Sequence, residues 1–200
     1  MLTELEQVPD AALPVEELRD HLKLGTGFAD ADAQDGMLRA YLRAALAAIE
    51  GRIGKALFER PFLWRVATWR EGAMQPLPLA PVTEVMRVTS VAADGAEAEW
   101  APERYSLVPD FQRPKLQAAG GMLPTIPEGG HVEIRFRAGF GADWAELPVD
   151  LQQAILMLAA RYYEARHDGA ADQDGGGLPF GVMALIERWR TVRVLGGGRT

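Results

Sequence analysis

The sequence predicts an α+β fold in which a helical bundle carries an inserted antiparallel β region and an extended C-terminal tail. Apolar residues recur at helical spacing near both ends of the chain, whereas the middle consists of short β-prone runs between proline- and glycine-rich turns. Because helices and strands are segregated along the chain, a repeated βαβ unit is excluded. The length of 200 residues suits one compact domain or two small ones.

The first helical segment spans residues 14–24. Pro14 suits the first turn of a helix, Glu16 and Glu17 place acidic groups near its amino end, and Gly25 follows its last residue. These signals predict a helix of about three turns.

The first long helix is predicted over residues 36–57. Its apolar residues are spaced by three or four positions, which places them on one buried face. They are Leu38, Leu42, Ala45, Ile49, Ile53 and Ala56. Gly51 and Gly54 lie near the end of this pattern, where each lowers helix stability by up to about 1 kcal/mol relative to alanine. We therefore expect the last turn to fray.

The segment 58–137 has the pattern of strands. Five runs of strand length are rich in β-branched, aromatic and other apolar residues. They span residues 62–69, 83–92, 104–108, 115–117 and 131–136. The connections between them are rich in proline and glycine, which mark turns and sheet edges. We expect one antiparallel sheet of about five strands in this segment.

A second long helix begins at Pro148, with Asp150 in its first turn. Its apolar residues again form one stripe. They are Leu151, Ala154, Ile155, Leu158, Ala159 and Tyr162. We expect this stripe to pack against the helix of residues 36–57.

The C-terminal part begins with a glycine-rich, acidic loop over residues 167–178. A short final helix is predicted over residues 180–191, where Leu185, Ile186 and Trp189 supply its apolar side. Residues 192–200 are expected to form an extended tail.

The composition excludes several classes of function. The chain has no cysteine, which rules out thiol nucleophiles, thiolate zinc sites, iron–sulfur clusters and disulfide scaffolds. Its longest strongly apolar stretch, residues 154–160, is much shorter than the roughly 18 residues that a membrane-spanning helix needs. The acidic N-terminus lacks the features of a signal peptide. We therefore expect a soluble cytoplasmic protein with no membrane partner.

No motif points to catalysis, a cofactor or a metal. His21, His131 and His167 are not at metal-ligand spacing from one another. The aspartates of residues 168–174 lack the remaining ligands of an EF-hand loop. Neither a Gly-x-Ser-x-Gly nucleophile elbow nor a phosphate-binding loop occurs. We expect no catalytic residue, no cofactor and no metal site, although a deep pocket with convergent polar groups would revive an enzyme hypothesis.

The charge is unevenly distributed along the chain. The net charge is −7, with nine acids against two bases in residues 1–35 and four arginines against one glutamate in residues 180–200. The acidic balance argues against tight binding of duplex DNA, because that affinity depends on neutralised phosphates. The basic end nevertheless leaves one alternative open, a DNA-binding accessory protein that uses the C-terminal arginines. The apolar residues between these arginines suit a segment that adds to a sheet or groove of another chain.

Several segments match a known family in their order and spacing. They are residues 13–23, 35–54, 77–82, 132–141, 147–156 and 161–166. Together they resemble the head–tail connector (adaptor) proteins of long-tailed phages and of phage-derived gene transfer agents. The resemblance covers residues 13–168, and the order of the segments is its specific part.

The resemblance implies how the chain is organised. We expect one adaptor domain over residues 1–200. Its parts would be helices in residues 13–57, the β region in residues 58–137, helices in residues 148–191 and the extended tail in residues 192–200.

The resemblance also implies a structural function without catalysis. Members of the family form a ring of identical subunits, commonly twelve, between the portal protein and the stopper, and DNA passes through the lumen without specific binding. Such a protein assembles in the cytoplasm of the bacterial host and ends in the neck of the virion or phage-like particle. An acidic chain suits a lumen that must not hold DNA phosphates. The residues expected to bind the portal are Arg188, Arg190, Val192, Arg193, Val194 and Leu195.

Overall fold

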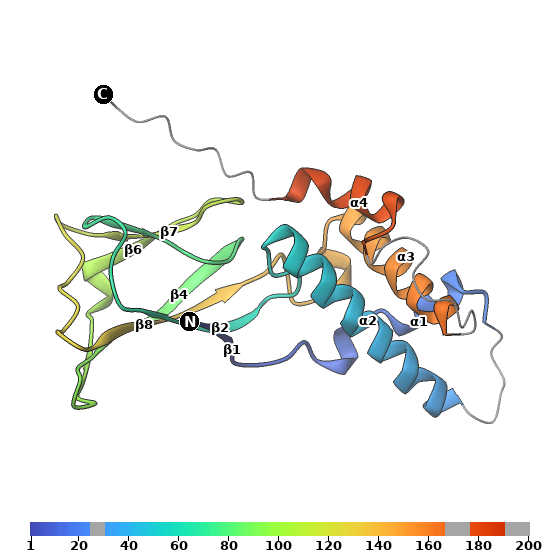
Figure 1. The fold of residues 1–200 in the computed structure, drawn as a ribbon, viewed down its shortest axis with the longest axis horizontal. Coiled ribbons are helices and arrows are strands. Elements are labelled where there is room, and N and C mark those ends of the chain that lie inside the picture. The colour runs from blue at the N-terminus through green and yellow to red at the C-terminus, as the bar shows by residue number, and fades with distance from the viewer. Residues whose placement is uncertain (25–30, 167–176, 191–200) are drawn as a thin grey trace. The chain divides into compact units, whose positions relative to one another are not determined.

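The computed structural model describes residues 1–24, 31–166 and 177–190. Helices and antiparallel sheets are segregated along the chain, which confirms the predicted α+β class (Figure 1). The chain divides into two compact units. The β unit comprises Met1–Val15 and Lys55–Pro148, and the helical unit comprises Glu16–Gly54 and Val149–Thr200. In the described ranges, no helix combines the length and apolar character needed to cross a membrane.

The helices follow the predicted order. They are α1 (Val15–His21), α2 (Ala31–Ile53), α3 (Val149–Ala165) and α4 (Phe180–Ile186), and the 3-10 turn η4 (Glu187–Trp189) follows α4. Within the helical unit, α2 packs along α3 and α3 packs along α4, which confirms the predicted pairing of the two long helices. The rings of Tyr41 and Tyr163 meet edge to face with centroids 6.2 Å apart. Because Met37 also lies beside Arg166, α2 and α3 are antiparallel.

The helical core consists mainly of the predicted apolar stripes. Its fully or almost fully buried residues are Leu18, Leu38, Leu42, Ala45, Leu46, Ile49, Ile53, Leu151, Ala154, Ile155, Leu158, Ala159, Val182 and Ile186. Tyr162, which was expected on the buried stripe, is only half-buried. The burial of so many aliphatic side chains is the main term that stabilises this unit.

The prediction for the carboxyl end of α2 was wrong. The helix stays regular through Gly51 and ends at Ile53, because Gly54 adopts the left-handed conformation with φ 69°. The next residues are extended, and the amide of Ala56 donates to the carbonyl of Ala80 at 3.1 Å. Ala56 is therefore buried in the core of the β unit instead of lying on the helix face.

The predicted final helix is shorter than expected. Regular α-helix ends at Ile186, and η4 carries the chain to Trp189. Arg190 then adopts an extended conformation, with φ −63° and ψ 135°. The tail predicted for residues 192–200 lies outside the described residues.

The β unit contains two antiparallel sheets where the sequence predicted one. Its strands are β1 (Leu2–Glu4), β2 (Arg60–Val66), β3 (Met74–Pro76), β4 (Val82–Val91), β5 (Glu97–Glu99), β6 (Tyr105–Val108), β7 (Lys115–Ala118) and β8 (His131–Ala138). One sheet has the order β1-β2-β8-β4-β5, and the other has the order β3-β7-β6. The strands that the prediction missed, β1, β3 and β5, are three residues long and gain their conformation from pairing.

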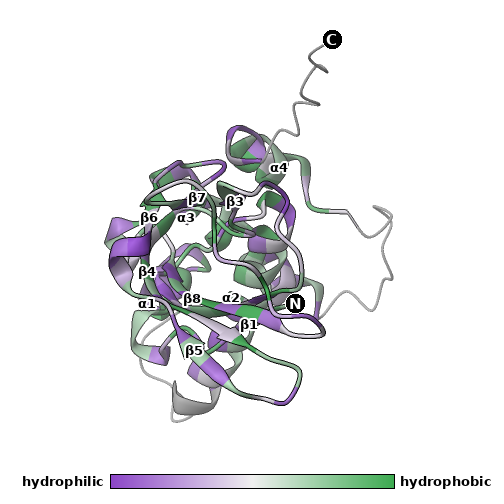
Figure 2. Ribbon diagram, turned by 90° about the vertical axis from the view of Figure 1, so that its left-hand side faces the viewer, coloured by the Kyte–Doolittle hydropathy of each residue, from purple (hydrophilic) through white to green (hydrophobic). Residues whose placement is uncertain are grey.

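The central strand β8 sets the register of the larger sheet. Phe136 lies opposite Phe62 on β2 and opposite Val85 on β4. Alternate residues of β8 are buried, as expected for a strand with one face on a core. Figure 2 shows the elements coloured by residue hydropathy, with hydrophobic and hydrophilic residues both present in the β unit. The core beneath them includes Val88, Trp100, Leu116, Val132, Ile134 and Phe136.

Candidate assembly surfaces

The carboxyl end of the described chain is held by one carboxylate. Oδ2 of Asp150 accepts a hydrogen bond from Nε1 of Trp189 at 2.8 Å and lies 2.7 Å from Nε of Arg188. The guanidinium of Arg188 also lies over the ring of Trp189, with Cζ 4.7 Å from the centroid. We call these three residues the Asp150 anchor. They join the start of α3 to the turn that follows α4.

The position of Asp150 in α3 explains why an acid lies there. Asp150 is the second residue of the helix, where unpaired amides and the helix dipole favour a negative charge. Its other oxygen, Oδ1, accepts the amide of Leu151 at 3.1 Å. The side chain is 19% exposed, so it can bond these groups while remaining partly hydrated.

The predicted portal-binding residues divide into two groups. Arg188 and Arg190 are described, and both have acidic partners within the chain: Arg188 pairs with Asp150, and Arg190 pairs with Glu187 at 3.0 Å. The others, Val192, Arg193, Val194 and Leu195, lie outside the described residues. Binding of the portal by this set stays a prediction.

A second candidate surface is the loop between β6 and β7. The side chain of Phe111 is 69% exposed, an unusual position for a large aromatic residue. The carbonyl of the same residue accepts a hydrogen bond from Nζ of Lys55, which is fully buried and also donates to Oε1 of Gln112 at 3.0 Å. The loop therefore exposes an apolar side chain, while hydrogen bonds from Lys55 hold its backbone in place.

Asp110 and Lys55 are the charged residues that hold the conformation of this loop. Oδ1 of Asp110 accepts the amides of Gln112 and Arg113 at 2.6 and 2.7 Å. These two hydrogen bonds lower the pKa of Asp110. Burial lowers the pKa of Lys55, and the nearby charge of Asp110 partly opposes that effect. Together these groups hold the turn in one conformation.

The N-terminal strand is fixed to the sheet by a buried arginine. Nε of Arg60 lies 2.6 Å from Oε1 of Glu4, and its NH1 donates to the carbonyl of Phe58 at 3.0 Å. The terminal amine of Met1 donates to the carbonyl of Arg65 at 3.0 Å. These contacts hold β1 as an edge strand, with the exposed side chain of Leu2 facing solvent.

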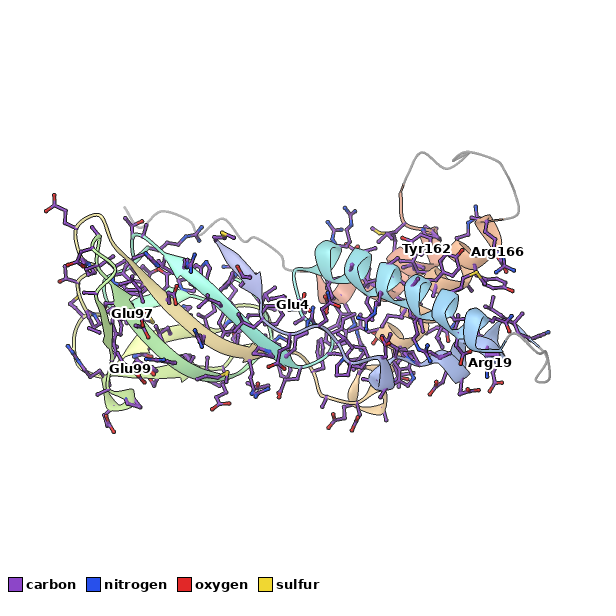
Figure 3. The ribbon with its side chains drawn as sticks, turned by 90° about the horizontal axis from the view of Figure 1, so that it is seen from below. Glu4, Arg19, Glu97, Glu99, Tyr162 and Arg166 are labelled. Atoms are coloured by element: carbon purple, nitrogen blue, oxygen red, sulfur yellow. The ribbon has the colours of Figure 1, made fainter. Side chains whose placement is uncertain are left out.

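The opposite edge of the same sheet is acidic. Strand β5 reads Glu-Ala-Glu, and all three residues are exposed. Glu97 and Glu99 are labelled at this edge in Figure 3. Glu99 pairs with Arg87 of β4 at 2.8 Å. Among the described residues, no cluster of acidic or histidine side chains could hold a metal ion.

Comparison with solved structures places the chain among particle components. It is 61% identical, with a TM-score of 0.88, to a chain in the neck of an empty GTA particle computed with C6 symmetry. It is 60% identical, with a TM-score of 0.85, to a chain in the virion of a native gene transfer agent (GTA) particle. In each case the match covers 98% of both chains. The chain belongs to the head–tail connector family.

A third similar structure bears on the assembly of such connectors. The chain is 57% identical, with a TM-score of 0.82 and 98% coverage of both chains, to a chain in the neck of a native GTA particle computed with C12 symmetry. The two neck structures support an oligomeric ring in the particle. Connectors of this kind are structural neck components, so the comparisons confirm the expectation that this connector is not an enzyme. No protein-family model and no curated protein matches the chain.

Sequence reasoning missed several residues of these candidate surfaces. It assigned Asp150 only to the helix dipole and Trp189 only to the apolar side of a helix. Their pairing joins positions 39 residues apart, which no local pattern encodes. Phe111 lies between Pro109 and Pro114, in a connection between predicted strands, and was given no role. A lone phenylalanine in a polar connection between two prolines was the available signal.

Proposed function

We propose that this connector is the adaptor subunit of a phage-like neck. In this proposal, twelve identical copies form a ring between the portal protein and the stopper, and DNA passes through the lumen. The observation that carries it is the 98% coverage of a neck chain from a particle computed with C12 symmetry. The net charge of −7 supports a lumen that releases DNA rather than holding it.

Docking on the portal is assigned to the C-terminal end. The residues involved are Arg188, Arg190, Val192, Arg193, Val194 and Leu195. Alternating basic and apolar side chains suit a segment that enters a groove or extends a sheet of a partner. The net positive charge of residues 180–200 favours an acidic docking surface on the portal.

Native mass spectrometry of the purified chain, alone and mixed with the portal protein of the same particle, tests the ring. We expect either a ring or a monomer that forms a ring when the portal is added. A chain that stays monomeric when the portal protein is added would contradict the proposal.

A truncation tests the docking residues separately. Removal of residues 190–200 should leave a folded chain that no longer binds the portal. Unchanged portal binding would contradict the assignment of the docking residues. It would not contradict the proposal that the chain forms a ring.

The alternative of a DNA-binding accessory protein has weaker support. The net charge of −7 opposes the binding of DNA phosphates. A gel shift at low salt measures it directly, since binding through arginines must appear there and weaken steeply as salt is added.

A further inference from the structure

The turn of residues 187–190, which follows α4, is held in part by polar side-chain contacts. Val182 and Ile186 are the buried residues of α4, and none of Glu187, Arg188, Trp189 and Arg190 is fully buried. Core packing therefore orients α4 but not the turn that follows it. The contacts that hold this turn include the Asp150 anchor and the exposed pair of Arg190 with Glu187.

Within the Asp150 anchor, the hydrogen bond from Trp189 is the dominant contact. The side chain of Arg188 is 70% exposed, and an ion pair so open to solvent contributes little. The indole of Trp189 is half-buried, and its Nε1–H donates to an ionised oxygen that is itself largely shielded. Such charge-assisted hydrogen bonds are the stronger class. The indole can therefore hold the turn in one place against α3.

We propose that Asp150 is a positioning residue for portal docking. By holding Trp189 and Arg188, it fixes the position of the turn that precedes residues 191–200. A turn that is already ordered loses less entropy when the chain docks on a partner. The inference rests on the proposed function, because it assigns a role to Asp150 in the docking of that segment.

The absence of cysteine in the chain allows a direct test of position. Spin labels at Gln153→Cys, an exposed site on α3, and at Thr191→Cys report the distance between α3 and the start of the segment. We expect a narrow distance distribution in the otherwise unchanged chain. Asp150→Ala should broaden it, and Trp189→Phe should do the same.

Two variants control for damage to the fold. Trp189→Phe removes the indole donor but leaves the start of α3 and the Asp150–Arg188 pair unchanged. Glu164→Ala removes an exposed acid from the other end of α3 and should leave the distribution narrow. Circular dichroism of each full-length variant verifies that the helices remain.

Portal binding by the same full-length variants links position to docking. We expect Asp150→Ala and Trp189→Phe to bind the portal protein about five- to tenfold more weakly, because docking must then also order the turn. Trp189→Phe is the more specific of the two variants, because it keeps the ion pair of Asp150 with the docking residue Arg188. Glu164→Ala should bind as the unchanged chain does.

The outcomes separate this inference from the proposed function. An unchanged distance distribution in both anchor variants overturns the positioning role, whatever the portal binding. A broadened distribution with unchanged portal binding overturns the link to docking. If removal of residues 190–200 leaves portal binding unchanged, the docking assignment itself fails, even where the spin labels show that Asp150 holds the turn.

Discussion

At the scale of single residues, Lys55 of the β unit carries an ionisable side chain in a buried position. Its side chain is fully buried, and burial lowers its pKa. In the alkaline range between this lowered pKa and the ordinary pKa of lysine, the unfolded chain binds more protons at this site than the folded chain does. The free energy of unfolding must then rise with pH across that range.

This linkage predicts a pH-dependent effect of Lys55→Met. Methionine keeps much of the volume and removes the titration, so the stability of the unchanged chain relative to the variant should increase from about pH 7 to about pH 10. Urea unfolding of both proteins at the two pH values measures the difference. A difference that stays constant would contradict the burial of a titrating ammonium group.

The backbone conformation and the close packing at position 139 require glycine. Its φ is 143°, and a Cβ at this position would lie 2.3 Å from the amide nitrogen of Glu59. The neighbouring amides bind adjacent segments: Gly139 donates to Pro81 and Phe140 donates to Leu57. The close approach therefore occurs where three stretches of the β unit meet.

We expect Gly139→Ala to lower the free energy of unfolding by about 2 to 4 kcal/mol, from a strained backbone and a steric overlap. Gly51→Ala is the matched control, because a Cβ there meets nothing within 4 Å and the residue lies inside α2. That change should raise stability by about 0.5 to 1 kcal/mol. Denaturant unfolding gives both values, and equal effects would refute the argument.

At the scale of elements, the two edges of the larger sheet differ in how they are protected. The edge at β1 is short and is tied down by Glu4 and Arg60. The edge at β5 instead carries two exposed glutamates, Glu97 and Glu99. Charges on an edge strand oppose pairing with a strand of another molecule.

Neutralising the β5 edge should therefore promote association. We expect the double change Glu97→Thr and Glu99→Thr to give light-scattering masses above those of the unchanged chain at the same concentration, because threonine favours strands and removes the repulsion. Glu103→Thr, an exposed acid outside the strands, is the control. Identical masses for the unchanged chain, the double variant and the control would show that the two glutamates do not prevent association through β5.

At the scale of the whole molecule, the helical unit is built from two segments that the β unit separates in sequence. Since α2 and α3 are antiparallel, the end of α2 and the start of α3 lie at the same end of the helix pair. The longer segment of the β unit, Lys55–Pro148, is therefore inserted in sequence between these two helix ends, and Met1–Val15 precedes the helical unit. Action of residues 1–200 as one adaptor domain stays a prediction.

This arrangement predicts that the helical unit folds without the insertion. In a chain that starts at residue 16, replacement of residues 55–148 by a Gly/Ser linker of about eight residues should preserve α2 and α3, because the linker can span neighbouring helix ends. Circular dichroism and cooperative thermal unfolding measure the result. A chain without helical signal would show that the helical unit requires the β unit.

The α+β class and the pairing of the long helices could be predicted because local apolar periodicity carries that information. Leu38, Leu42, Ile49, Leu151 and Leu158 all lie in the core as their spacing required. The strands of three residues could not be predicted, because a segment such as Glu97–Glu99 becomes a strand only through pairing with β4.

We could infer from the sequence the class of fold, the two buried helix stripes and the absence of thiol chemistry, because these depend on composition and short-range spacing. The folded chain was needed to show that the strands form two sheets, that Ala56 joins the β core and that Asp150 contacts Trp189. Each of these outcomes is a contact between residues far apart along the chain. Such contacts depend on how the elements pack, and no local pattern encodes them.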